Sequence, residues 1–146
     1  MSSAHETAVE ALLRQPFPDT AYGRRDAFGD MDHHVARLAV TQDFWEDRSK
    51  EVVGPARDAI DHDHDRLAAA LTARWGPAEE VDLGETDREL GEAAGFFRSQ
   101  TRDMLVWSCP TYSRWVALAV IQADPELPFE LFVAVGAGPT WSAARN

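Results

Sequence analysis

The sequence predicts an α+β fold in which a three- to four-stranded antiparallel meander is packed by helices, with a helix-rich N-terminal half. Apolar side chains alternate through residues 103–135 and are interrupted by two turn signals, which is typical of strands joined by hairpins. Apolar residues in 55–75 instead recur at intervals of three and four, which predicts an amphipathic helix. A length of 146 residues fits a single domain, 1–146.

The two turns of the meander predict its strands and their pairing. The predicted strands are residues 103–108, 113–123 and 128–135. The turns are centred on residues 110–111 and 125–126. The resulting pairs are Leu105 with Val116 and Trp107 with Arg114 in the first hairpin, and Leu118 with Val133 and Val120 with Leu131 in the second.

Both faces of this meander are apolar, because strand side chains alternate between the two faces. One face carries Leu105, Trp107, Val116, Leu118, Val120, Leu131, Val133 and Val135. The other carries Met104, Val106, Trp115, Ala117, Ala119, Ile121, Phe132 and Ala134. A sheet with one face in water would alternate with polar residues. We therefore expect the helix of residues 55–75 on the Leu118 and Val133 face, and the N-terminal helices, a ligand or a partner on the other.

The N-terminal half is predicted to be mainly helical. Residues 1–29 should form a helix, opened by a capping box, and then a loop arm. Residues 30–75 should be helical, with a helix in 42–53 and with Pro55 as the first residue of the clearest helix. Residues 33–40 fit either a helix or a short strand, because their apolar residues satisfy both periods.

Acidic residues concentrate in residues 79–98, which are predicted to connect the halves through a short strand and a helix; residues 136–146 should form a tail. Seven acids and one arginine between positions 79 and 92 give a local charge of −6, within a formal −11 for the chain. This charge repels phosphate backbones and anionic lipids, so we expect neither nucleic acid nor a membrane as a partner. A protein partner is expected instead, and the acidic charge favours a basic one; a solvated acidic loop is the alternative.

The cysteine content and the apolar runs predict a cytoplasmic protein. Cys109 is the only cysteine, which excludes an internal disulfide and fits a reducing compartment. The first ten residues lack the basic and apolar regions of a signal peptide. No apolar run approaches the ~20 residues that span a bilayer.

Histidines and aspartates in residues 58–65 raise the question of a metal site. Asp58 and His62 lie one helical turn apart, and His33 or His34 could complete a set of ligands from elsewhere. The spacing matches no known metal motif, so we predict no metal and no cofactor, with His62 and Asp58 as the candidates if one binds.

Catalytic residues are not predicted anywhere in the chain. Cys109 precedes a turn and could be exposed as a nucleophile, but a catalytic cysteine needs a neighbouring base. The sequence assigns none of the five histidines to that role.

A partner-binding surface is predicted from two kinds of residue. Trp107 flanks the first hairpin and Trp141 lies in the polar tail, and tryptophans often anchor interfaces. Acidic residues would steer the encounter with the partner. The predicted partner-binding residues are Glu79, Glu80, Glu85, Asp87, Trp107 and Trp141.

The layout of helices followed by a meander, over residues 55–135, resembles that of secretion-chaperone-type domains and bacterial immunity proteins. The segments 115–118 and 127–131 are similar to those of small uncharacterised actinobacterial α+β proteins. The resemblance is one of layout and carries no function to numbered residues. Because an enzyme needs a convergent polar set and the sheet faces offer almost none, we expect a protein-binding module without catalytic activity, such as an adaptor, chaperone or immunity-like protein, either as a monomer or as a homodimer. The alternative is a small-ligand-binding protein or enzyme with a pocket between the sheet and the N-terminal helices.

Overall fold

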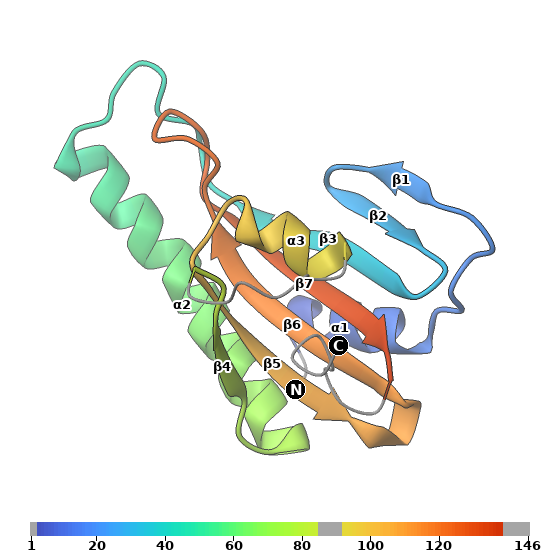
Figure 1. Cartoon of the computed structure of the whole chain (residues 1–146). Coiled ribbons are helices and arrows are strands. Elements are labelled where there is room, and N and C mark those ends of the chain that lie inside the picture. Colours follow the sequence, from blue (N-terminus) through green and yellow to red (C-terminus); the bar gives the residue numbers. More distant parts are fainter. Residues whose placement is uncertain (1–2, 85–91, 139–146) are drawn as a thin grey trace.

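The structure, a computed structural model, describes residues 3–84 and 92–138 and shows an α+β fold built on one antiparallel sheet (Figure 1). The sheet has seven strands in the order β1-β2-β3-β7-β6-β5-β4. In chain order the elements are α1 (Ala4–Arg14), β1 (Tyr22–Arg24), β2 (Ala27–Asp30), β3 (His33–Val40), α2 (Lys50–Trp75), β4 (Glu79–Asp82), α3 (Glu92–Arg98), β5 (Asp103–Cys109), a 3₁₀ turn (Pro110–Tyr112), β6 (Arg114–Ile121) and β7 (Glu130–Ala137). No helix in the described ranges is long and apolar enough to cross a membrane.

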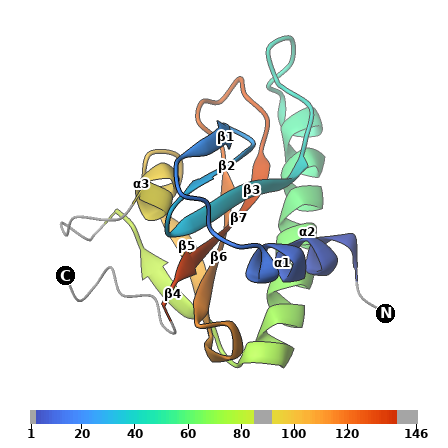
Figure 2. The same cartoon turned by 90° about the vertical axis from the view of Figure 1, so that its right-hand side faces the viewer.

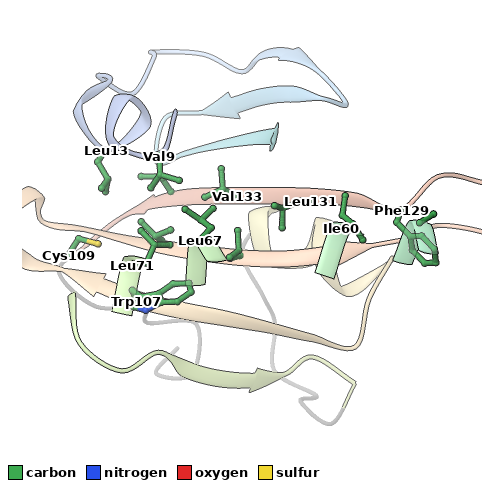
Figure 3. Close-up of a cluster of buried hydrophobic side chains, with 14 of the residues drawn as sticks. Val9, Leu13, Ile60, Leu67, Leu71, Trp107, Cys109, Phe129, Leu131 and Val133 are labelled. Atoms are coloured by element: carbon green, nitrogen blue, oxygen red, sulfur yellow. The ribbon is translucent and has the colours of Figure 1, made fainter. Parts of the chain in front are cut away.

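Helices cover both faces of the sheet, as the apolar character of both faces requires. Figure 2 shows α1 and α2 on one face and α3 on the other. The larger core lies under α1 and α2, where Leu67 and Leu71 of α2 meet Trp107 and Val133 of the sheet (Figure 3). The smaller core lies under α3, where Phe97 packs with strand residues of the second face. The second face is thus covered by this chain's own elements.

The predicted faces of β5, β6 and β7 are confirmed. The first predicted face belongs to the core under α1 and α2, and the second belongs to the core under α3. In the second hairpin Leu118 pairs with Val133, as predicted. The helix predicted for residues 55–75 does pack on this face, because its buried residues join the same core.

The register of the first hairpin was predicted wrongly by two residues. Trp107 pairs with Val116 rather than with Arg114. The 3₁₀ turn lengthens the connection, and Ser113 closes it in the left-handed region at φ 53°. A shift of two residues leaves every side chain on its predicted face, which is why the face assignment survives.

The predicted helix-rich N-terminal half and the count of three to four strands are both wrong. Residues 33–40 form strand β3, which pairs antiparallel with β7 along its length. Part of the predicted loop arm forms the β1–β2 hairpin, which pairs with β3. The apolar residues of 33–40 fit both periods, so the free edge of β7, a partner roughly a hundred residues later, decides between helix and strand.

Helix α2 also begins earlier than predicted. Its N-cap is Ser49, whose carbonyl oxygen accepts a hydrogen bond from the Val53 N–H at 2.9 Å. Pro55 therefore lies inside the helix, where it removes one backbone hydrogen bond. The helix predicted for residues 42–53 is wrong for the residues before Ser49, which form an irregular segment. Phe44 in this segment is buried, and its N–H donates to the Glu126 carbonyl at 2.8 Å.

Trp107 is a core residue, which corrects its predicted role as an interface anchor. Its side chain is 1% exposed, and Nε1 donates a hydrogen bond to Oγ1 of Thr72 on α2 at 3.2 Å. The indole ring fills the space between β5 and α2 (Figure 3). The sequence could not separate these two roles, because a tryptophan in a strand suits a core as well as an interface.

Replacing Trp107 should therefore test the core and not a surface. We expect Trp107→Ala to lower the free energy of unfolding by about 3–5 kcal/mol, because it leaves a large cavity in the core. Denaturant unfolding followed by circular dichroism measures the change. Trp45→Ala is the matched control, since Trp45 is 65% exposed and its loss should cost no more than about 0.5 kcal/mol. Equal costs for the two variants would contradict the assigned core.

Candidate functional site

A groove between α2 and the β4–β5–β6 side of the sheet is the candidate functional site. It consists of two adjoining hollows of about 310 Å³ and 340 Å³. The first is lined by Arg57, Asp61, His64, Glu80, Thr101, Asp103, Met104, Leu105, Leu118, Ala119 and Val120. The second is lined by Arg57, Gln100, Thr101, Arg102, Asp103, Val120, Ile121, Gln122 and Phe129. Four residues line both hollows, so they form one continuous groove.

The floor of the groove is apolar and its rim is polar. Leu105 and Val120 belong to the strand face that packs toward α2 and are half-buried, so they form the accessible floor, with the buried Leu118 beneath it. Glu80 of β4 pairs directly with Leu105, so it lies on the same face of the sheet. Asp103 precedes Leu105 by two residues and therefore shares that face. Strand alternation thus places two carboxylates along the edge of an apolar floor.

Arg57 and His64 of the rim are each paired with an acidic residue of α2. The Arg57 guanidinium donates to both carboxylate oxygens of Asp61, at 3.0 and 3.1 Å. It also lies over the Phe129 ring at 5.1 Å from the centroid. His64 Nδ1 is 3.0 Å from an Asp65 carboxylate oxygen. These contacts tie Arg57 and His64 to their own helix.

Glu80 and Asp103 are not matched in this way. Both are exposed, and neither side chain makes a hydrogen bond or ion pair with another residue that the structure describes. A third carboxylate, Asp82, pairs directly with Asp103 across β4 and β5 and accepts a hydrogen bond from the Gly84 N–H at 2.9 Å. This side of the sheet therefore concentrates negative charge.

A buried carboxylate elsewhere, Glu130, is fully engaged in holding the fold together. It is 5% exposed and accepts hydrogen bonds from Arg25 at 2.6 Å and Arg37 at 3.2 Å. Arg25 also donates to Gln100 at 2.7 Å and lies over the Phe132 ring at 5.6 Å. This network joins the β1–β2 turn to β7, and its charged groups are paired with one another, so they are not available to a ligand.

His34 forms a second internal cluster near the end of α1. Its side chain is 0% exposed, and the Tyr22 hydroxyl lies 2.6 Å from Nδ1. Nε2 is 3.2 Å from the Gln15 carbonyl oxygen, so Nε2 carries the proton and Nδ1 accepts from the tyrosine. Burial lowers the pKa of His34 below its usual value, and the charge of Arg114 acts in the same direction. The ring is thus a neutral tether between β3, β1 and the segment after α1.

Cys109 lies beside a third cluster, in which Glu10 binds Arg74 at 2.6 Å and the Tyr112 hydroxyl at 2.8 Å. The thiol is completely buried, and this burial raises the pKa of Cys109 to about 12. A thiol with such a pKa is protonated at neutral pH and is a poor nucleophile. The exposed nucleophile considered from the sequence is therefore not what the structure presents.

The metal candidates do not come together with other ligands. Asp58 and His62 are exposed on α2, while His33 and His34 are buried in β3. In the ranges 3–84 and 92–138, no three histidine, cysteine or acidic residues lie close enough to hold one ion.

The predicted partner-binding residues are only partly brought together. Glu80 lines the groove, whereas Glu79 pairs with Val106 and so lies on the α3 face. Glu85, Asp87 and Trp141 lie outside the described residues. Sequence reasoning missed Asp61, His64 and Asp103. The first two are one turn apart on α2, and Asp103 begins a predicted strand, but only the packing of α2 on the sheet makes them neighbours.

Comparisons with known proteins identify no relative of this chain. No protein-family model, no curated protein and no solved structure matches the chain. The site must therefore be interpreted from its own geometry.

The burial of His34 should make the stability of the fold depend on pH. Its pKa is lowered in the folded state, so the unfolded chain takes up the proton first as the pH falls through about 6.5. The stabilisation that neutral His34 contributes is complete above that pH and declines as the pH falls below it. The loss amounts to about 1.4 kcal/mol for each tenfold difference in proton affinity between the folded and the unfolded state. Urea unfolding of the protein and of His34→Gln at pH 7.5 and pH 5.5 measures the effect.

The variant should lose less stability than the wild type between these two pH values. His62→Gln, at an exposed position of α2, is the control and should follow the wild type. A His34→Gln profile parallel to that of the wild type would contradict the assignment of His34 as a buried neutral base.

The buried thiol predicts slow chemical labelling. Cys109, 0% exposed and with a pKa of about 12, should react with an aromatic disulfide reagent at pH 8 only as the chain opens. In denaturant one thiol per chain should react at the rate of a free cysteine. Rapid labelling of the native protein, measured by absorbance, would show that the thiol is accessible.

Proposed function

We propose that this protein is a non-catalytic protein-binding module that holds an extended segment of a partner in the groove beside α2. The single observation that supports this most is the combination of an apolar floor and a polar rim in the first hollow, which adjoins the more polar second hollow. Protein interfaces have the same anatomy, with an apolar centre surrounded by polar residues. An adaptor, a chaperone or an immunity-like protein would use such a surface. The cytoplasmic location expected from the sequence is part of the proposal.

An extended segment fits the groove better than a compact ligand does. The two hollows share Arg57, Thr101, Asp103 and Val120, and together their linings reach from Glu80 to Phe129. An extended peptide directs alternate side chains to the same side, which can place successive apolar residues on such a floor.

The polar groups of the rim favour binding over catalysis. Arg57 is occupied by Asp61, and His64 by Asp65. General acid–base chemistry instead needs titratable groups that converge on one reacting atom. The thiol of Cys109 belongs to the other end of β5 and is buried.

A small-ligand-binding protein or enzyme with a pocket between sheet and helix is the second candidate. Each hollow, at about 310 and 340 Å³, has the volume of a small-molecule site. His64 and Glu80 both line the first hollow and would be its acid and base. This candidate differs from the first in that it predicts a compact ligand.

Selection of peptides from a displayed random library on the immobilised protein tests the proposal. Enriched peptides should bind the isolated protein, as measured by fluorescence anisotropy. Val120→Trp should weaken binding at least about tenfold, because Val120 lines both hollows and the larger ring fills them. Ala73→Trp is the matched control, since Ala73 is exposed on α2 and lines neither hollow.

Thermal unfolding of both variants establishes that they fold. Failure to enrich any peptide, or equal binding by Val120→Trp and the wild type, would contradict the proposal. Stabilisation by a small molecule that Val120→Trp abolishes, without any peptide binding, would support the second candidate instead.

A further inference from the structure

We infer that the segment bound in the groove carries a lysine or arginine seated between Glu80 and Asp103, two positions along the segment from an apolar side chain on the floor. This inference rests on the proposed function and adds the chemistry of the partner to it. The occupant is an extended basic and apolar segment of a partner protein.

The strand register places the two carboxylates where one cation can reach both. Glu80 pairs with Leu105, and Asp103 is two residues from Leu105 on the same strand. Such diagonal neighbours on one face of an antiparallel pair lie roughly 7–8 Å apart. A guanidinium or ammonium group between them can form charge-assisted hydrogen bonds to both carboxylates.

The charge of the first hollow is complementary to such a group. Its lining contains three acids, Asp61, Glu80 and Asp103, and one arginine, Arg57, which gives a net charge of −2 with His64 neutral. Arg57 is bound to Asp61, so the two uncompensated charges are those of Glu80 and Asp103.

A third carboxylate lies close to Glu80 and Asp103. Asp82 of β4 is directly opposite Asp103 of β5, so the two side chains share the face of the sheet that carries Glu80. A cation bound at Asp103 would therefore also lie near Asp82.

The two ends of the groove differ in charge, which fixes where the basic residue lies. Among the described residues, Arg57, Arg102 and Asp103 are the charged groups that line the second hollow. Because Arg57 is bound to Asp61, the charges of Arg102 and Asp103 cancel there, so a basic side chain is favoured beside β4 and not beside Phe129. Residues two apart in an extended segment point to the same side, so the predicted pattern is basic, any residue, apolar.

Three synthetic peptides test the inference. They repeat Lys-Ser-Leu, Glu-Ser-Leu and Lys-Ser-Ser, and their binding to the full-length protein is measured by fluorescence anisotropy. We expect the Lys-Ser-Leu peptide to bind best and to weaken as sodium chloride rises from about 50 mM to about 500 mM, because salt screens exposed charges. The other two peptides should bind at least about tenfold more weakly, since each lacks one of the two contacts.

Neighbouring glutamates of β4 give the decisive pair of variants. Glu80→Gln should weaken binding of the Lys-Ser-Leu peptide about tenfold, as should Asp103→Asn. Glu79→Gln makes the same change in net charge on the same strand but on the opposite face, so it should alter binding less than about twofold.

The possible failures can be told apart. Equal effects of Glu79→Gln and Glu80→Gln on peptide binding would show a general electrostatic attraction. That result would contradict a specific contact of the basic side chain with Glu80 and Asp103. Equal binding of the Lys-Ser-Leu and Glu-Ser-Leu peptides, both weakened by Val120→Trp, would overturn the basic seat while the groove remained a peptide site. Equal binding of the Lys-Ser-Ser and Lys-Ser-Leu peptides would overturn the role of the floor. No binding by any of the three, together with an unproductive library selection, would overturn the proposed function itself.

Discussion

The antiparallel pairing of β3 with β7 is the constraint on which the rest of the structure depends. It joins residues 33–40 to residues 130–137 and so makes one sheet from the two ends of the described chain. Once β3 is in place, the chain must travel from one side of β7 to β4 at the far edge. That crossing covers four strand spacings, roughly 19 Å, whereas a helix of 26 residues is roughly 39 Å long. Helix α2 is therefore long enough to make this connection, and Figure 1 shows it running alongside β5.

The packing of α2 against β5, β6 and β7 accounts for both the large core and the groove. Leu67 and Leu71, in the second half of the helix, pack closely on Trp107 and Val133 (Figure 3). Nearer its start, the helix and the β4–β5–β6 side of the sheet leave the hollows that Arg57 lines. A helix packs on a sheet through its apolar stripe, so a stripe interrupted by polar residues such as Asp61 and His64 leaves space there.

The polar groups of the protein fall into two kinds. Glu130 and His34 are buried, and each is satisfied by partners from other elements, which fixes the β1–β2 hairpin on the sheet. Glu80 and Asp103 lie at the sheet edge, exposed and without a partner in the described residues. Buried polar groups must be paired for the fold to form, whereas exposed carboxylates remain available to a ligand. Charged edge strands also protect a sheet from pairing with other chains, so these acids have a structural use even in the free protein.

The sequence by itself determined which face of the sheet each residue of β5, β6 and β7 occupies, because alternation is local and a slip of two residues, as between Trp107 and Arg114, preserves it. It also identified Glu80 as a candidate for binding. It did not determine that residues 33–40 form a strand, nor that Trp107 is a core residue, since both depend on partners distant in the chain. The groove likewise exists only in the tertiary structure. Its rim joins Asp61 and His64 of a helix to Glu80 and Asp103 of two strands, and only the path of α2 across the sheet brings these residues together.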